Sequence, residues 1–232
     1  KPADEVIELI AAAQCEDGYL NTYFTVKAPG ERWTNLAECH ELYCAGHLIE
    51  AGVAFFQATS KRRLLEVVCR LADHIDSVFG PDDNQLHGYP GHPEIELALM
   101  RLYDVTQEPR YMALANYFVE QRGTQPHFYD IEYEKRGKTS FWNAYGPAWM
   151  VMDKPYSQAH LPLAEQTTAV GHAVRFVYLM AGVPCAPEQE RRQTPGLPAV
   201  MEKHGPASAV YYGRHWLTEQ RGSLQQRLRP AE

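Results

Sequence analysis

Hydrophobic residues recur every three or four positions along most of the chain, a spacing typical of helices that bury one face. The pattern is clearest from about residue 35 to Thr59. Asn35 can cap this helix, and Glu38, three residues on, supplies the second half of a capping box. The other expected helices span residues 4–13, 61–78, 95–105, 109–121 and 164–181. The pattern therefore predicts an all-α fold.

Three stretches lack a strong helical pattern. Residues 17–24 are predicted to form an aromatic loop or a short strand, and residues 80–91 form a loop rich in glycine, proline and aspartate. Residues 123–155 are predicted to be loop with at most one helical turn. The helix at residue 95 is expected to open near Pro93, because proline suits the first helical position.

An internal repeat relates two of the predicted helical hairpins. Each copy consists of a helix, a turn centred on Thr-x-x-x-Arg and a second helix. Such hairpins stack linearly into a solenoid or close into an α/α barrel. The small residues Ala45, Gly46, Ala51 and Gly52 favour a crowded inner position for the first helix. At a shift of 47 residues, Leu48, Ala51, Phe55, Phe56, Thr59 and Arg63 match Ile95, Ala98, Leu102, Tyr103, Thr106 and Arg110.

Composition narrows the functional classes. The 232 residues suit one or two domains, and 29 acidic against 22 basic residues argue against a nucleic-acid partner. No apolar run reaches the roughly 18 residues of a membrane span. The five cysteines are odd in number and form no Cys-x-x-Cys pair, so we expect reduced thiols and a cytoplasmic location.

Three histidines are candidates for ligand binding. His40, His92 and His172 each lie near the start of a predicted first-in-hairpin helix. In a barrel the inner helices are parallel, so these histidines would meet at one mouth. The helix dipole there disfavours imidazolium, which leaves neutral rings that can exchange hydrogen bonds with sugar hydroxyls. A histidine of this kind is otherwise an ordinary core residue.

A zinc site of the three histidines is also conceivable, but we expect none. No pair has the i, i+4 spacing of a helical metal site, and no local carboxylate completes the set. Aromatic residues crowd the stretch after residue 127, where they either stack on sugar faces or simply pack. These aromatics are Phe128, Tyr129, Tyr133, Phe141, Trp142, Tyr145 and Trp149.

Several motifs resemble glycoside hydrolase family 127, which contains β-L-arabinofuranosidases. The longest are His-Glu-Leu-Tyr-Cys-Ala-Gly-His-Leu-Ile-Glu-Ala at 40–51 and Gly-Tyr-Pro-Gly-His-Pro-Glu-Ile-Glu-Leu-Ala at 88–98. Val-Gly-His-Ala-Val-Arg at 170–175 is similar as well, and shorter matches lie at 17–22, 71–75 and 158–160. Together the motifs cover residues 1 to about 183.

The resemblance implies an (α/α)6 barrel that removes terminal arabinofuranosyl groups with retention. It also implies a zinc-held cysteine nucleophile and a glutamate acid/base. By motif position, His40, His92 and His172 match sugar-binding residues, and His160 is a further candidate. An arabinofuranose-containing carbohydrate is the expected partner, with neither nucleic acid nor membrane.

The chain departs from the family pattern in one important respect. The Gly-Gly-Ile-Gly-Ser motif before the acid/base glutamate, the Glu-Thr-Cys zinc ligands and the later Cys-Cys pair do not occur in it. We therefore expect residues 1–183 to form a partial barrel without catalytic residues, inactive alone and without bound zinc. Self-association through the open barrel edge is also expected.

Residues 184–232 have a different character and are expected to be an irregular tail. They contain no Asp, Asn, Ile or Phe and hold six of the 16 prolines. Codons permitted for Val210–Glu232, read one base later, give Phe-Ile-Thr-Gly-Gly-Ile-Gly-Ser and a following glutamate. An out-of-frame translation is therefore predicted, against a genuine proline-rich extension.

Two other functions remain open from the residues themselves. An α/α barrel can carry a sugar epimerase or isomerase that uses two histidines as acid and base. A stack of helical hairpins can also serve as a non-catalytic binding module.

Overall fold

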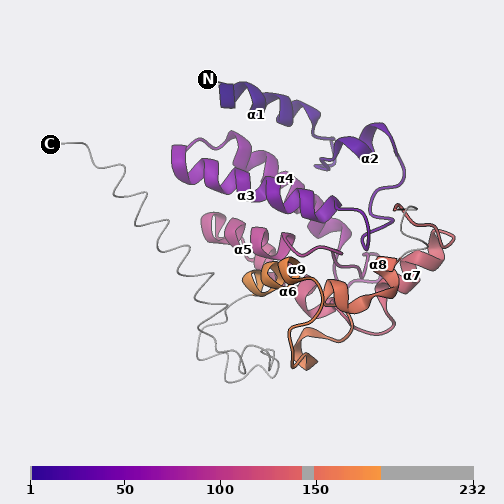
Figure 1. The fold of residues 1–232 in the computed structure, drawn as a ribbon. Coiled ribbons are helices and arrows are strands. Elements are labelled where there is room, and N and C mark those ends of the chain that lie inside the picture. Colours follow the sequence, from indigo (N-terminus) through magenta and orange to yellow (C-terminus); the bar gives the residue numbers. More distant parts are fainter. Residues whose placement is uncertain (1, 143–148, 184–232) are drawn as a thin grey trace. The chain divides into compact units, whose positions relative to one another are not determined.

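The chain is all-α in the computed structural model, which describes residues 2–142 and 149–183 (Figure 1). Residues 164–169 belong to a second unit and are considered by themselves; the rest of the described chain is one compact unit. The helices are α1 Pro2–Ala13, α2 Thr22–Val26, α3 Glu41–Thr59, α4 Arg63–Val78, α5 Ile95–Thr106, α6 Pro109–Gln121, α7 Phe128–Lys135, α8 Trp149–Met152 and α9 Ala173–Gly182, with 3-10 turns at Lys154–Ser157 and Leu163–Glu165.

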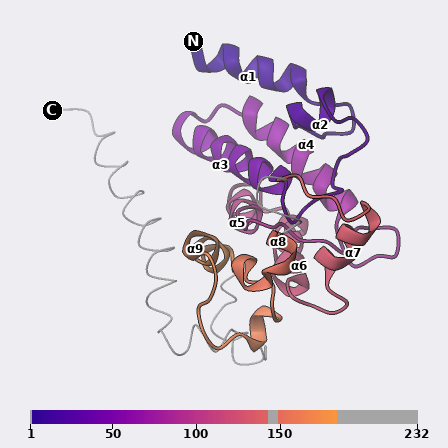
Figure 2. The same ribbon diagram turned by 45° about the vertical axis from the view of Figure 1, so that its right-hand side comes forward.

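Two helical hairpins form the centre of the compact unit. Helix α3 packs against α4, and α5 packs against α6. Helix α5 also lies between α3 and α9, so these three make one layer, while α4 contacts both α1 and α6 in a second layer (Figures 1 and 2). This is part of an α/α barrel built of stacked hairpins, as the sequence predicts. The layer of α3, α5 and α9 corresponds to the expected inner wall.

The internal repeat extends to the hydrogen bonds at the helix ends. Thr59 Oγ1 donates to the carbonyl four residues earlier at 2.6 Å, and Thr106 Oγ1 does the same at 2.7 Å. The next residues, Ser60 and Gln107, both end their helices in the left-handed conformation, with φ of 60° and 58°. Each hairpin therefore turns in the same way, which lets α5 stack on α3 in register.

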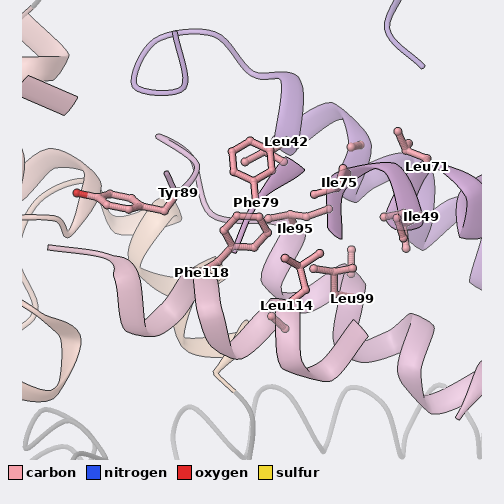
Figure 3. Close-up of a cluster of buried hydrophobic side chains, with 14 of the residues drawn as sticks. Leu42, Ile49, Leu71, Ile75, Phe79, Tyr89, Ile95, Leu99, Leu114 and Phe118 are labelled. Carbon is pink, nitrogen blue, oxygen red and sulfur yellow. The ribbon is translucent and has the colours of Figure 1, made fainter. Parts of the chain in front are cut away.

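Helix α5 provides the middle of the hydrophobic core. Ile95, Ala98, Leu99 and Leu102 have no exposed surface. Their neighbours come from the surrounding helices, as the apolar stripes predict. Figure 3 shows this cluster, with Leu42, Ile49, Leu71, Ile75, Phe79, Tyr89, Ile95, Leu99, Leu114 and Phe118 labelled.

The predicted start of the long helix is wrong. Asn35 and Glu38 do bond reciprocally, from Asn35 Nδ2 to Glu38 Oε2 at 2.8 Å and from Glu38 N to Asn35 Oδ1 at 3.2 Å. They close only an isolated turn, and α3 begins at Glu41 with His40 as its N-cap. The helix does not continue back to this turn, because groups from outside the segment bind residues 36–38.

Three other boundaries also differ from the predictions. Residues 17–24 do not form a strand, and part of this stretch is helical. Asn21 caps the short helix α2 by accepting the N–H groups of Tyr23 and Phe24. Helix α7 occupies part of the predicted loop 123–155. The last described helix begins at Ala173, capped by His172, and not at Ala164. Pro93 precedes α5, whose first residue is Ile95.

Two further predictions are only partly accessible. No helix within the described parts of the chain is both long and apolar enough to cross a membrane. The predicted irregular, out-of-frame tail at 184–232 lies outside the described residues.

Candidate functional site

Aromatic rings from two helix starts and α9 meet at one end of the inner layer. The rings of His40 and His92 lie 6.0 Å apart between centroids. Tyr43 lies beside both, with its ring centroid 5.5 Å from that of His40 and 4.5 Å from that of His92. Tyr178 of α9 is 5.7 Å from His92. The convergence of two of the sequence-predicted histidines at the N-terminal ends of α3 and α5 is therefore confirmed.

The segment before His40 is held by a carboxylate from α7. Glu132 Oε2 accepts the N–H of Leu36 at 2.7 Å, and Oε1 accepts that of Ala37 at 2.8 Å. Gly91 N donates to the carbonyl of Leu36 at 2.9 Å. A Cβ on Gly91 would lie 2.2 Å from the carbonyl oxygen of Ala37, so only glycine allows the two segments to meet. This close approach brings His40 and His92 together.

His92 is fixed by its own backbone and by buried donors. Its Nδ1 lies 2.8 Å from the carbonyl oxygen of Pro93, so a neutral ring carries its proton on Nδ1 and leaves Nε2 as acceptor. Arg122 Nη2 and the hydroxyl of Tyr129 both donate to the carbonyl of Pro90, at 3.0 and 2.9 Å. The carbonyl groups that lead to His92 are thus anchored to the core.

The pKa values of the two histidines favour neutral rings. Burial lowers the pKa of His92 to about 4, with Arg175 adding to the effect. Burial likewise lowers the pKa of His40 below its ordinary value. The sequence predicts neutral rings through the helix dipole, and in the structure burial is the first cause of both lowered pKa values.

His172 lies near enough to His92 to contribute to its lowered pKa, whereas His160 does not. His172 caps α9 and stacks edge-on against Tyr156, with ring centroids 5.2 Å apart. The guanidinium of Arg175 lies over the ring of Tyr156, 4.5 Å from its centroid, and donates to the carbonyl of Gly91. That link ties the α9 start to the segment carrying His92. Within the described residues His160 makes no ring contact with the cluster.

The cluster continues one helical turn along α3. The ring of His47 lies 4.4 Å from Tyr43 and 6.2 Å from Tyr178. Its Nδ1 is 3.1 Å from Oε1 of Glu94, a residue with no exposed surface. Burial and the nearby charge of Glu50 raise the pKa of Glu94 well above its ordinary value. Sequence reasoning missed Glu94, although the 47-residue repeat makes it the counterpart of His47 in the second hairpin.

Comparison with known proteins identifies the family. The profile of the β-L-arabinofuranosidase, GH127 catalytic domain, matches residues 1–203. The chain belongs to glycoside hydrolase family 127. It is 42% identical over 185 residues to a non-reducing end β-L-arabinofuranosidase from Bifidobacterium longum subsp. longum, covering 78% of this chain and 27% of that protein.

Solved family 127 structures agree. One is a β-L-arabinofuranosidase from Geobacillus stearothermophilus T6, with 54% identity and a TM-score of 0.72 over 78% of this chain and 28% of that one. Another, a β-arabinofuranosidase, has 36% identity and a TM-score of 0.62 over 77% of this chain and 26% of that one. The chain thus spans about a quarter of the length of these relatives.

The thiols near His40 do not fit the cysteine-ligated zinc that the family resemblance implies. Burial raises the pKa of Cys39 to about 12 and also raises that of Cys44. Among the described residues, neither thiol belongs to a group of three or more potential ligands close enough together to hold a metal ion. The sequence also offers neither a Cys-Cys pair nor a Glu-Thr-Cys stretch.

A hollow of about 580 Å³ adjoins His40 on the other side of α3. Tyr23, Phe141 and Trp142 line it, with centroid distances of 5.9 Å from Tyr23 to Phe141 and 5.1 Å from Phe141 to Trp142. Glu38 holds this aromatic strap by accepting the N–H of Phe141 at 2.9 Å. The other loop aromatics have different environments: Phe128 and Tyr129 are buried in the core, Tyr133 packs against it, and Trp149 meets Tyr156 edge to face. Tyr145 lies outside the described residues.

Proposed function

We propose that this chain is the sugar-binding part of a retaining β-L-arabinofuranosidase. The substrate is a carbohydrate with a terminal arabinofuranosyl group. The single observation that supports this most is the pair of half-buried histidines, His40 and His92, whose pKa values are lowered, at the mouth of a family 127 barrel segment. Neutral imidazoles both accept and donate hydrogen bonds, which suits sugar hydroxyls.

Each histidine has a distinct part in the proposed pocket. His92 presents Nε2 as an acceptor, because Nδ1 is engaged by the carbonyl of Pro93. His40 faces the same space from the α3 start, and Tyr43 supplies a ring for the apolar sugar face. His172 contributes from the α9 start. We assign His160 a peripheral contact.

We further propose that the chain alone does not hydrolyse the glycoside. A retaining glycosidase places a nucleophile and an acid/base on opposite sides of the anomeric carbon, about 5 Å apart. Burial raises the pKa of the two thiols beside His40, which disfavours a thiolate nucleophile, and Glu94 has no exposed surface. The catalytic glutamate, the nucleophilic cysteine and their zinc would belong to a longer product of the other reading frame beyond residue 183.

The test measures binding and turnover separately. The full 232-residue chain is titrated with methyl β-L-arabinofuranoside by saturation-transfer NMR, and hydrolysis of p-nitrophenyl β-L-arabinofuranoside is followed in parallel. We expect weak binding that His92→Ala abolishes, and no release above the blank. His87→Ala is the matched control, since His87 is an exposed loop histidine before the same helix.

Two results would contradict the proposal. Release of p-nitrophenol that disappears in His92→Ala would show that the chain is itself a glycosidase. Binding unchanged in a His40→Ala/His92→Ala double variant would place the sugar elsewhere. Gene sequencing past residue 183 tests the reading frame: it should encode Gly-Gly-Ile-Gly-Ser and a later Glu-Thr-Cys.

Self-association and location complete the proposal. Val174 and Val177 of α9 are 49% and 59% exposed, and burying such a pair against a second copy is favourable. Sedimentation should detect a dimer that Val177→Lys weakens; a monomer at every concentration would refute this.

A cytoplasmic location is supported by the four free thiols of the described residues, Cys15, Cys39, Cys44 and Cys69.

A further inference from the structure

Behind the histidine cluster, three potential metal ligands from two helices face one another. His47 and Glu50 lie on α3 at an i, i+3 spacing, and Glu94 directly precedes α5. We propose that His47, Glu50 and Glu94 bind a divalent transition-metal cation of the zinc type. This site contains no sulfur, so it is distinct from the cysteine-ligated zinc that the family resemblance implies, and it does not depend on the proposed sugar binding.

The ligand atoms have suitable separations. One atom from each of the three side chains lies within 4.8 Å of the others. His47 Nδ1 and Glu94 Oε1 are 3.1 Å apart. Bonds of roughly 2.0–2.2 Å to a tetrahedral zinc place neighbouring ligands about 3.3 Å apart.

Glu94 supplies an independent reason for a cation. Its side chain has no exposed surface, and among the described residues neither carboxylate oxygen receives a hydrogen bond. His47 Nδ1 is close, but the contact does not have hydrogen-bond geometry. A buried carboxyl group in this position needs either a proton or a cation, because an isolated charge in the interior is very costly.

The surrounding charges favour a dication over a simple ion pair. Arg101 Nη1 lies 2.5 Å from Glu50 Oε1, so one guanidinium offsets the charge of Glu50. Glu94 is then the carboxyl group of the two that needs either a proton or a cation. One imidazole nitrogen, carboxylate oxygens and a water molecule form the mixed nitrogen and oxygen set that zinc accepts, whereas magnesium and calcium prefer oxygen alone.

Access to the site is through His47, whose side chain is 42% exposed. Its ring is flanked by Tyr43 and Tyr178, which limit its rotation. A ligand that is both accessible and oriented allows the cation to enter without unfolding either helix. The fourth position would open toward the same space, as in metal sites that keep a water ligand.

The chemical alternative is a proton shared between Glu50 and Glu94. It satisfies both carboxyl groups without a metal. The two possibilities differ in response to zinc and cobalt, since only a metal site gives a saturable ligand-field spectrum. Tetrahedral cobalt bound by nitrogen and oxygen absorbs in the visible region, while thiolate ligands add a charge-transfer band in the near ultraviolet.

The experiment titrates the full chain, freed of metal by chelator and kept reduced, with Zn²⁺ by calorimetry and with Co²⁺ by absorption. We expect one site per chain and no thiolate band. Glu94→Gln, which preserves shape, and His47→Ala should each weaken binding at least roughly tenfold. Glu66→Gln and His87→Ala, both exposed, are the matched controls and should bind as the parent chain does.

Three outcomes would overturn the assignment. Absence of saturable binding would mean that the two carboxyl groups share a proton. A thiolate band lost in Cys44→Ser would move the metal to the cysteines. Equal affinity of Glu94→Gln and the parent, with His92→Ala weakened instead, would place it in the ring cluster. Circular dichroism of each variant confirms that the helices remain.

Discussion

Arg122 and Glu96 form an ion pair in which neither side chain has any exposed surface. Arg122 Nη2 lies 3.0 Å from Glu96 Oε1. The same guanidinium donates to the carbonyls of Pro90 and Ser157, at 3.0 and 2.9 Å. One buried cation therefore joins the end of α6, the start of α5, the segment that leads to His92 and the turn at Ser157.

Removing one partner should destabilise the fold strongly. Arg122→Met keeps the volume of the side chain but leaves Glu96 buried without its cation. We expect the free energy of unfolding to fall by about 3–5 kcal/mol, measured by urea denaturation. The double variant Arg122→Met/Glu96→Leu should recover most of this loss, because it no longer buries a charge.

An exposed ion pair is the control for that measurement. Arg62 and Glu66 are 3.9 Å apart with side chains 67% and 56% exposed. Arg62→Met should change the free energy of unfolding by less than about 1 kcal/mol. Similar losses in Arg62→Met and Arg122→Met would contradict the role given to the buried pair.

Glu41, next to His40, should make stability depend on pH. Burial raises its pKa from 4.5 to about 7, although it accepts hydrogen bonds from the Tyr19 hydroxyl at 2.5 Å and the Trp33 N–H at 2.9 Å. The folded chain then holds this proton more tightly than the unfolded chain. The contribution of Glu41 to the free energy of unfolding is complete below about pH 4.5. It is lost as pH rises through about 7, at up to about 1.4 kcal/mol per pH unit.

Glu41→Gln isolates that contribution. The difference in unfolding free energy between parent and variant should shrink or reverse from pH 4.5 to 7, the direction given by the raised pKa. Glu66→Gln, at an exposed position, should leave the slope of the parent unchanged. Parallel curves for the parent and Glu41→Gln would show that Glu41 titrates normally.

The repeated helix ends offer a stabilising substitution. Ser60 has φ of 60°, a left-handed conformation that costs a side-chain residue more than glycine. Ser60→Gly should raise the free energy of unfolding by on the order of 0.5–1 kcal/mol, which thermal denaturation detects as a higher melting temperature. Ala54→Gly, at an exposed position inside α3, should lower the free energy of unfolding by about 1 kcal/mol. A loss in both variants would mean that this turn carries no strain.

Gly46 sets how closely α3 approaches the start of α5. A Cβ there would lie 2.6 Å from Cγ of Glu94 and 3.0 Å from the backbone N of Ile95. Gly46→Ala should therefore cost about 1–3 kcal/mol in unfolding free energy through overpacking, despite the better helix propensity of alanine. Cys44→Ala, on an exposed face of the same helix, should be nearly neutral. Stabilisation by Gly46→Ala would show that the helices can separate freely.

Local sequence signals predicted most helices well. The bounds of α6 are the predicted ones, and α4 differs by two residues, because strong apolar stripes and Pro109 mark these helices. The α3 start failed because Asn35 and Glu38 satisfy a capping pattern without a helix behind it. Two backbone N–H groups of that turn bond to Glu132, 96 and 95 residues away, and no local pattern indicates such a partner.

The sequence by itself determined the all-α class and the 47-residue repeat, since helical periodicity is a local property, and it placed His40 and His92 near the starts of two helices. Only the tertiary structure decided which buried charges face each other. Arg122 meets Glu96 across 26 residues, and Glu94 meets His47 across a helix interface that Gly46 keeps narrow. Such contacts depend on how packed helices are rotated and spaced, and the spacing of residues along the chain says little about either.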